Sequence, residues 1–427
     1  MAENISELAP GHADSPERRA SFFRQSGWLM IANIGGGILM WAVHFLSKRI
    51  PNSEYGLFGV LLSVVMCIPT MPLQMVMTHQ TAQAIARNRL RELAGMIRWI
   101  TAGTFLLWLA GAIAAVVWRE PISAHWGIHN PVAFYVTLGV LLFALWQPVF
   151  WGVLQGEEDF LWLGWSMISN GIGRLVVAVV AVMALGAWAA GMMSGVLLGL
   201  AVATGIAIWQ TRSFWTAPAS RFDWREVLGE MLPPMIGFAA FQFLFTGDTM
   251  FVKAYFSGDD AGFYVAAGTL SRALIWLVGP LASVMFPRIV HSTAKAEKTN
   301  LVSLVFWGTA ILALLGAAGL TVLGPFVVRI VYKAVYVKVA TSVLPWYAGA
   351  MIPLALANVL LNNLLAKSAF KVVAPLCVLA VGYGVALTHF HASLVMVLQT
   401  MGCFNLLLLA LCAWFTWRDK RNSVRAS

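Results

Sequence analysis

Three ionisable side chains, Arg174, Asp248 and Arg272, lie deep inside long apolar segments of the chain. A charge inside a membrane-spanning helix is costly, so such residues are the first candidates for function. At a rise of 1.5 Å per residue, each lies roughly 12 to 15 Å from a predicted helix end, and the three ends share one side of the membrane. We therefore expect all three at a similar depth.

The carboxylate of Asp248 has two interpretations. It is either the structural partner of Arg272, which would lie on the next, antiparallel helix, or a group that takes up a proton or a sodium ion. An ion pair that breaks and re-forms would combine these two interpretations. We predict Asp248 as a coupling or gating residue.

Other polar residues on the same helices are predicted to line a substrate cavity. At 100° per residue, Gln242, Thr246, Thr249 and Lys253 share one face of their helix, and Asp248 lies roughly 120° away. Asn170 shares a helix face with Arg174, four residues further on. Both Arg174 and Arg272 suit an anionic substrate, because a guanidinium matches phosphate oxygens; alternatively, Arg174 packs against backbone carbonyls.

The elements that hold these residues are membrane helices. Hydrophobic residues make up 60% of the 427-residue chain, charged residues 11%, and the mean hydropathy is +0.78. These values indicate an all-α polytopic membrane protein, in which a net charge of +10 reflects topology and not nucleic-acid binding. Twelve spans are predicted, at 26–46, 57–77, 99–118, 132–153, 161–184, 188–209, 231–256, 262–285, 301–323, 341–362, 371–389 and 393–416.

The chain divides into two similar halves. Residues 53–63 and 259–269 match in character at an offset of 206, with Gly56 on Gly262. Two six-helix units of the same orientation are related by a pseudo-twofold axis along the membrane normal. We predict a cytoplasmic tail over 1–25, lobes over 26–210 and 231–417, a cytoplasmic linker over 211–230, and a basic cytoplasmic tail over 418–427.

Basic residues predict the orientation. Placing both termini in the cytoplasm puts 19 of the 28 Lys and Arg residues on that side and 7 on the other. The four cysteines lie in apolar runs without metal-ligand spacing, and no Walker or His-Glu-x-x-His motif occurs. The sequence therefore predicts no catalytic residue, no metal site and no bound cofactor, while coupling to a proton or sodium gradient stays open.

Five segments, in order, resemble the polysaccharide-biosynthesis flippase branch of the multidrug/oligosaccharidyl-lipid/polysaccharide exporter superfamily. They are "SEYGLFGVLLSVV" (53–65), "GVLQGEEDF" (152–160), "GDTMFVKAYFSGDDAGFYVAAGTLSR" (247–272), "GPLASVMFPRIVH" (279–291) and "VRIVYKAVYVKVATSVLPW" (328–346). By this resemblance, Asp248 is the family's acid in the seventh helix. The closing Gly-hydrophobic-Tyr falls on Gly262 and Tyr264. The Leu-Gln-Gly turn and a helix-ending proline fall on Leu154, Gln155, Gly156 and Pro287. The chain departs at Tyr332-Lys333, where relatives commonly carry Tyr-Gly.

The resemblance implies a V-shaped pair of lobes that flips a polyprenyl-pyrophosphate-linked oligosaccharide across the bacterial inner membrane by alternating access. Its partners would be this lipid-linked oligosaccharide, membrane lipids and other polysaccharide-assembly proteins. One alternative is a multidrug cation antiporter of the same superfamily, which would prefer acidic cavity residues. Another is a membrane glycosyltransferase or polymerase, which would need a large outer loop with catalytic residues.

Overall fold

The protein is a bundle of long helices. The computed structural model describes the backbone of residues 16–275 and 301–425, and the side chains of 27–275, 302–365 and 367–418. Eleven helical stretches within the described residues are long and apolar enough to span a membrane. The predicted span 262–285 runs into undescribed residues, and its described part is helical from 258 to 275. The all-α polytopic class is thus confirmed.

The first half of the chain forms one layer of the molecule. Its elements are α1 (Pro16–Ala42), η2 (Val43–Lys48), α2 (Asn52–Met66), α3 (Thr70–Ala86), α4 (Leu90–Val117), α5 (Arg119–Trp126), α6 (Pro131–Gly156), α7 (Phe160–Met183) and α8 (Trp188–Gln210). Helix α7 packs against α1 and α8, and α6 packs against α3 and α8. Helices α2 and α3 together make one span, broken between Met66 and Thr70 next to Pro69.

The second half forms the other layer. After the connecting helix α9 (Arg212–Trp215), its elements are α10 (Trp224–Tyr255), the helical segment 258–275, α12 (Leu301–Val331), α13 (Ala334–Ala366), η3 (Phe370–Val372), α14 (Val373–His389) and α15 (Leu394–Arg425). Helix α13 packs against α12 and α15, while α14 packs against α10. Helix α10 also contacts α2 and α3, so it connects the two layers.

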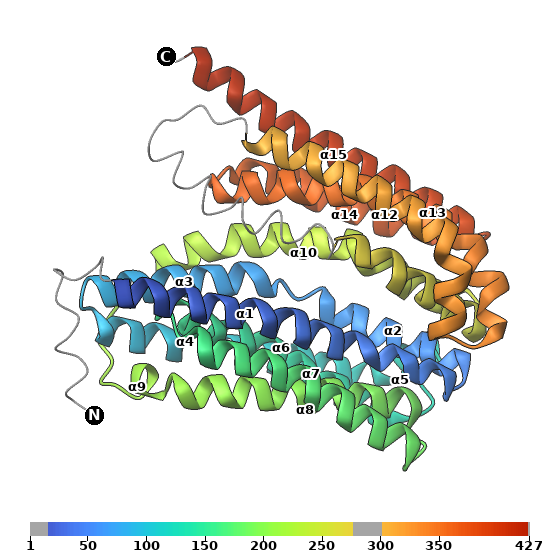
Figure 1. The fold of residues 1–427 in the computed structure, drawn as a ribbon, viewed down its shortest axis with the longest axis horizontal. Helices are drawn as coiled ribbons and strands as arrows, with labels where there is room; N and C mark the ends of the chain where they lie inside the picture. Colours follow the sequence, from blue (N-terminus) through green and yellow to red (C-terminus); the bar gives the residue numbers. More distant parts are fainter. Residues whose placement is uncertain (1–15, 276–300, 426–427) are drawn as a thin grey trace.

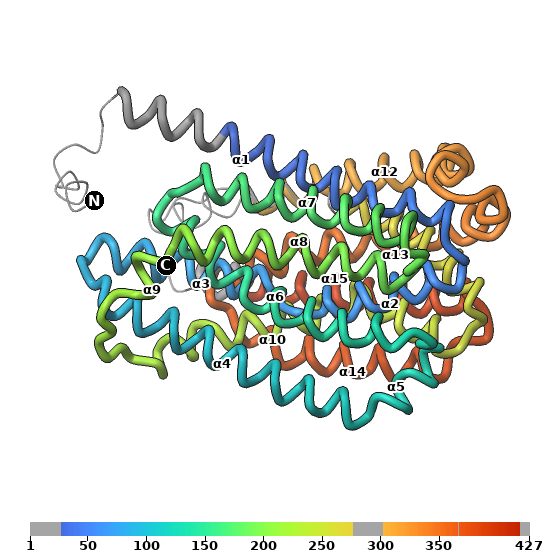
Figure 2. Tube along the Cα trace, turned by 90° about the horizontal axis from the view of Figure 1, so that it is seen from below, coloured from blue at the N-terminus to red at the C-terminus, as the bar shows by residue number. Residues whose placement is uncertain are grey.

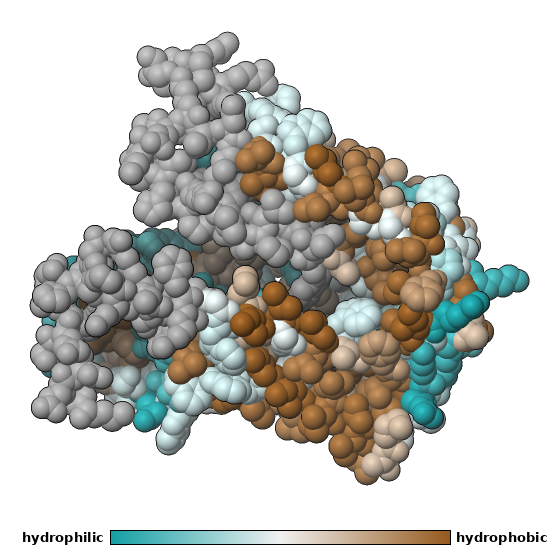
Figure 3. All heavy atoms as spheres, viewed as in Figure 1, coloured by the Kyte–Doolittle hydropathy of each residue, from teal (hydrophilic) through white to brown (hydrophobic). Residues whose placement is uncertain are grey.

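The helices run along the long axis of the molecule (Figures 1 and 2), and the two layers meet at one end and diverge towards the other (Figure 1). They meet at the end that carries α5, here called the α5 end, and diverge towards the end that carries α9, the α9 end. In the space-filling view, hydrophobic residues cover the middle of the molecule and hydrophilic residues gather at the α5 end (Figure 3). This banding is what a bilayer requires of a protein that spans it.

Two helices extend beyond the predicted spans. Helix α1 begins at Pro16 and α10 begins at Trp224, whereas the corresponding spans were predicted from residues 26 and 231. The Asp223 carboxylate caps α10 by accepting hydrogen bonds from the backbone N–H groups of the second and third helical residues. Apolar length marks only the part of a helix that lies in hydrocarbon, so polar first turns were missed. The division into lobes itself stays a prediction.

The chain between α8 and α10 lies against α4. The Arg98 guanidinium donates to the carbonyl oxygens of Trp215 and Ala217, both at 2.6 Å. The Ser220 N–H donates to the Arg91 carbonyl at 3.0 Å. This connection is therefore held on the first half of the molecule.

The turn between α6 and α7 contains a carboxyl group that is poorly suited to ionise. Burial, with Asp159 nearby, raises the pKa of Glu157 from 4.5 to about 8. The folded protein therefore binds this proton more tightly than the unfolded chain does. The resulting stabilisation is complete below pH 4.5 and is lost as the pH rises towards 8.

We accordingly expect Glu157→Gln to flatten the pH dependence of stability. Between pH 5 and 8 the melting temperature of the wild type should fall more than that of the variant, because glutamine never ionises. Thermal unfolding of the purified protein at several pH values measures this. Parallel curves for the two proteins would contradict the assigned pKa.

Candidate functional site at the junction of the two halves

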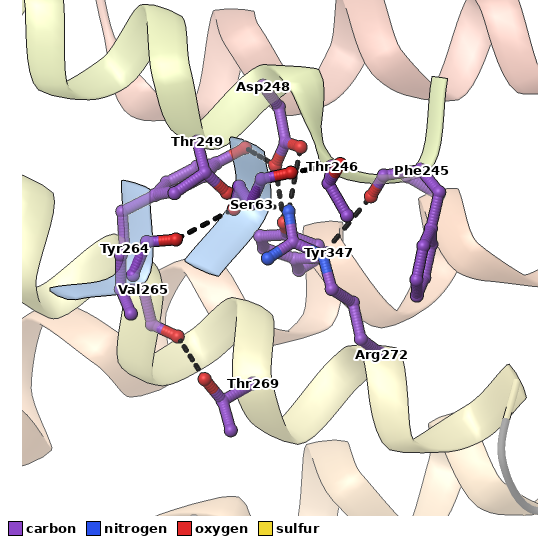
Figure 4. Close-up of polar contacts among 12 residues, drawn as sticks. Ser63, Phe245, Thr246, Asp248, Thr249, Tyr264, Val265, Thr269, Arg272 and Tyr347 are labelled. Atoms are coloured by element: carbon purple, nitrogen blue, oxygen red, sulfur yellow. Dashed lines mark hydrogen bonds and ion pairs between the residues drawn. The ribbon is translucent and has the colours of Figure 1, made fainter. Parts of the chain in front are cut away.

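Asp248 lies in the middle of α10, and its carboxylate is the centre of a cluster of polar side chains that donate hydrogen bonds to it. Its carboxylate is fully buried and accepts hydrogen bonds from Arg272 Nη2 at 2.7 Å and from Tyr264 Oη at 2.8 Å. The hydroxyl of Tyr347, on α13, donates to the same oxygen as Tyr264. Figure 4 shows these side chains converging on Asp248 from two other helices, the segment 258–275 and α13. A buried carboxylate is tolerable only with such partners.

Arg272 is held by more than its ion pair with Asp248. Its Nη2 also donates to Thr249 Oγ1 at 2.7 Å, and its Nε donates to the Phe245 carbonyl at 3.1 Å. Its guanidinium carbon lies 5.5 Å from the centre of the Tyr347 ring, within the range of a cation–π contact. The predicted pair between Asp248 and Arg272 is therefore confirmed. A proton or a cation that binds Asp248 therefore competes with three hydrogen-bond donors.

The tyrosines of this cluster were missing from the predicted site. Tyr264 entered only as the end of a family motif, and nothing in the sequence connected Tyr347 with Asp248. A third tyrosine, Tyr383 on α14, is also fully buried and close enough to interact electrostatically with Asp248. Its hydroxyl has no hydrogen-bond partner among the described residues.

This difference gives a matched pair of variants. Tyr264→Phe should destabilise the protein by about 1 to 3 kcal/mol, because a buried carboxylate loses a donor. Tyr383→Phe should be close to neutral, because its hydroxyl makes no bond that could be lost. Thermal unfolding in detergent compares the two. Equal losses would mean that the Tyr264 hydroxyl is not bound to Asp248 in the folded protein.

Most of the predicted polar stripe on α10 faces the first half of the molecule. Gln242 Nε2 donates to the Met66 carbonyl at 2.8 Å, and Lys253 Nζ donates to the Ser53 carbonyl at 3.3 Å. The Thr246 hydroxyl donates to the Gln242 carbonyl of its own helix at 2.9 Å and lies 3.5 Å from the Ser63 carbonyl. Thr249 instead joins the Arg272 cluster.

In this conformation Gln242 and Lys253 therefore tie α10 to α2, and Thr246 lies against the same helix. Their role in binding substrate stays a prediction, for a conformation in which these contacts have separated.

A second set of contacts closes the junction at the α5 end, here called the junction seal. His44 Nδ1 lies 2.8 Å from Tyr55 Oη, which lies 3.1 Å from Tyr332 Oη across the two halves. Ser47 Oγ donates to the Val331 carbonyl at 3.3 Å. Lys333 Nζ donates to the Ile50 carbonyl at 2.5 Å.

Close backbone packing completes the junction seal. A Cβ on Gly56 would lie only 2.8 Å from the backbone nitrogen of Gly262, and a Cβ on Gly262 would collide with the Asn52 carbonyl. The two glycines matched by the internal repeat thus lie against each other. This is the position expected for equivalent residues near a pseudo-twofold axis.

Arg174 lies apart from the Asp248 cluster, in the first half. Its Nε is buried without a hydrogen-bond partner, and no carboxylate lies within 4 Å of it in the described chain. It is close enough to His44 to act on it electrostatically. Asn170 is buried at the contact of α7 with α8, where its Oδ1 would lie 2.9 Å from a Cβ on Gly199. The structure therefore separates Asn170 and Arg174 from the other predicted site residues.

The fold matches those of solved transporters. The chain superposes on an inward-facing conformation of a multidrug resistance MATE family transporter of the MOP superfamily with a TM-score of 0.72, at 13% identity, covering 94% of this chain and 98% of that one. It matches an outward-facing conformation of such a transporter with a TM-score of 0.62, at 13% identity and 94% coverage of both chains. It matches the lipid II flippase MurJ, in an inward closed conformation, with a TM-score of 0.66, at 12% identity, covering 92% and 87%.

Sequence comparison supplies the family. None of the curated proteins matches the sequence. The model of one protein family, described as polysaccharide biosynthesis protein, matches residues 22–293, which is more than half of the chain. The chain belongs to the polysaccharide biosynthesis protein family.

Proposed function

We propose that the protein flips a polyprenyl-pyrophosphate-linked oligosaccharide, or a related polysaccharide precursor, across the cytoplasmic membrane by alternating access. The family to which the chain belongs and the MurJ-like fold support translocation of a lipid-linked substrate. The protein acts as a transporter and not as an enzyme. Its fold places the two halves so that one end can close while the other opens.

The observation that carries the choice of substrate is the unpaired Arg174. The described spans hold this arginine without a carboxylate partner, while Asp248 is already neutralised by Arg272. A guanidinium in a low-dielectric interior attracts phosphate oxygens and repels cations. This balance of charge favours an anionic substrate over the cationic drugs of an antiporter.

We assign the α9 end to the cytoplasm, because the basic residues then follow the positive-inside rule. The junction seal then closes the outer side, and the diverging helices face the cytoplasm. The higher TM-score to the inward-facing MATE transporter, 0.72 against 0.62 for the outward-facing one, supports this assignment.

The pair of Asp248 and Arg272 provides a switch within this cycle. A phosphate that reaches the second half competes with Asp248 for Nη2 of Arg272. Once released, the carboxylate is buried and must take a proton, a cation or another donor, because an unpaired buried charge is costly. Substrate binding and rearrangement of α10 are thereby linked.

Transport in proteoliposomes tests the substrate class. The purified protein should move a fluorescent polyprenyl-pyrophosphate oligosaccharide between leaflets faster than protein-free liposomes do, and should leave a cationic dye in place. Arg174→Lys should retain more of this activity than Arg174→Gln, because it keeps the charge. Dye export without movement of the lipid-linked sugar would favour the antiporter alternative.

A further inference from the structure

Two lysines of the second half hold backbone carbonyls of the first half at the α5 end. Lys253 Nζ, on α10, donates to the Ser53 carbonyl, and Lys333 Nζ, between α12 and α13, donates to the Ile50 carbonyl. Both acceptors lie in the short stretch 50–53 between η2 and the first turn of α2. An ammonium that binds a neutral carbonyl leaves its charge uncompensated, so an anion would be a stronger partner.

Neither lysine forms an ion pair. Among the described residues, no carboxylate lies within 4 Å of Lys253 or Lys333. Glu54 and Asp259 are nevertheless close enough to Lys253 to interact electrostatically with its ammonium. Lys333 has the neutral Ile50 carbonyl as its hydrogen-bond partner.

The position of Lys333 makes it accessible once the two halves separate. It lies between the spans Val302–Val331 and Ala334–Leu365, at the membrane boundary where phosphate groups of lipids are found. Its carbonyl partner belongs to the other half, so any opening of the junction seal removes that bond. An opened seal would leave a lysine that lacks an acceptor and faces the lipid headgroup level.

We propose, building on the proposed function, that Lys333 is a phosphate-binding residue of the outer mouth of the transporter. While the seal is closed, the Ile50 carbonyl occupies its ammonium. When the halves separate, phosphate oxygens of the lipid-linked substrate take the place of that carbonyl. Lys253 remains a latch, because the nearby carboxylates of Glu54 and Asp259 would repel an anion.

Thiol labelling measures opening of the seal without measuring transport. Ser47→Cys, in a chain whose four native cysteines are replaced, introduces a thiol at a fully buried position of the seal. Proteoliposomes are treated with a membrane-impermeant thiol reagent, with and without inorganic pyrophosphate. A ligand that binds only the open state raises its population, so pyrophosphate should raise the labelling rate.

Variants of the two lysines then assign the site. Lys333→Met should raise by about tenfold or more the pyrophosphate concentration needed for half of this effect, because a charge-assisted contact is lost. Lys333→Arg should keep the response. Lys253→Met should raise labelling before pyrophosphate is added and still allow a further rise. A Lys333→Met protein that responds like the wild type would overturn the proposal, as would a response lost only in Lys253→Met.

Two further arms separate this inference from others. Labelling that follows the phosphatidylglycerol content of the liposomes, with no response to pyrophosphate, would assign Lys333 to bilayer headgroups and overturn the proposal. Flipping of the lipid-linked oligosaccharide without a Lys333-dependent pyrophosphate response would overturn this inference and leave the proposed function intact. A Lys333-dependent pyrophosphate response without flipping of the lipid-linked oligosaccharide would support the phosphate site and contradict the proposed substrate.

Discussion

Replacing Asp248 with alanine is expected to reduce flipping to the rate of protein-free liposomes. The change leaves the buried Arg272 guanidinium without its counter-charge and removes the acceptor of two tyrosine hydroxyls. Breaking a buried pair by removing one partner costs about 3 kcal/mol or more. The variant should therefore also unfold at a lower temperature than the wild type.

A second variant separates transport from folding. Asp248→Asn keeps the size of the side chain and an acceptor oxygen for the tyrosines, so it should be more stable than Asp248→Ala. It cannot carry the charge that holds Arg272, and we expect it to lose flipping as well. Flipping at the wild-type rate by a folded Asp248→Asn protein would show that the charge of Asp248 has no part in the cycle.

Replacing Gly262 with valine is expected to hold the α5 end open. The new side chain would collide with the Asn52 carbonyl in the closed junction seal. Overpacking of this kind costs about 3 kcal/mol, which changes the ratio of closed to open molecules by about a hundredfold. The thiol introduced by Ser47→Cys should consequently react much faster with an impermeant reagent, and flipping should fall because one state is depleted.

Gly349→Val serves as the matched control. Gly349 is also a helical glycine of the second half, but a Cβ at this position meets nothing within 4 Å. Labelling and flipping should remain close to those of the wild type. Equal labelling of the Gly262→Val and Gly349→Val proteins would mean that the close approach of Gly262 to Asn52 does not control the seal.

The sequence was sufficient for the fold class, and it offered the central pair as one of two interpretations of Asp248. Asp248 and Arg272 could be paired because a rise of 1.5 Å per residue places them at one depth on consecutive antiparallel helices. The match of Gly56 with Gly262 also indicated that these residues are equivalent in the two halves, and the structure brings them into contact. Both inferences needed only local geometry and the order of the helices.

The remaining contacts could not be predicted, for physical reasons. Tyr347 reaches Asp248 from 99 residues further along the chain, and no local pattern records such packing. The acceptors of Gln242, Lys253 and Lys333 are backbone carbonyls, which every residue carries and no sequence motif marks. The sequence therefore indicated the polar stripe on α10 but not the backbone carbonyls to which its residues donate.

A reversible cross-link between the two halves tests the central claim, transport by alternating access. Cys67 Sγ lies 3.6 Å from Thr246 Oγ1, so Thr246→Cys places a thiol opposite a native cysteine on the other side of the junction. We predict that the oxidised protein does not flip the lipid-linked oligosaccharide, that reductant restores flipping, and that Cys67→Ser with Thr246→Cys is insensitive to oxidant. Full flipping by the cross-linked protein would contradict the account, because α2 and α10 would then not need to separate.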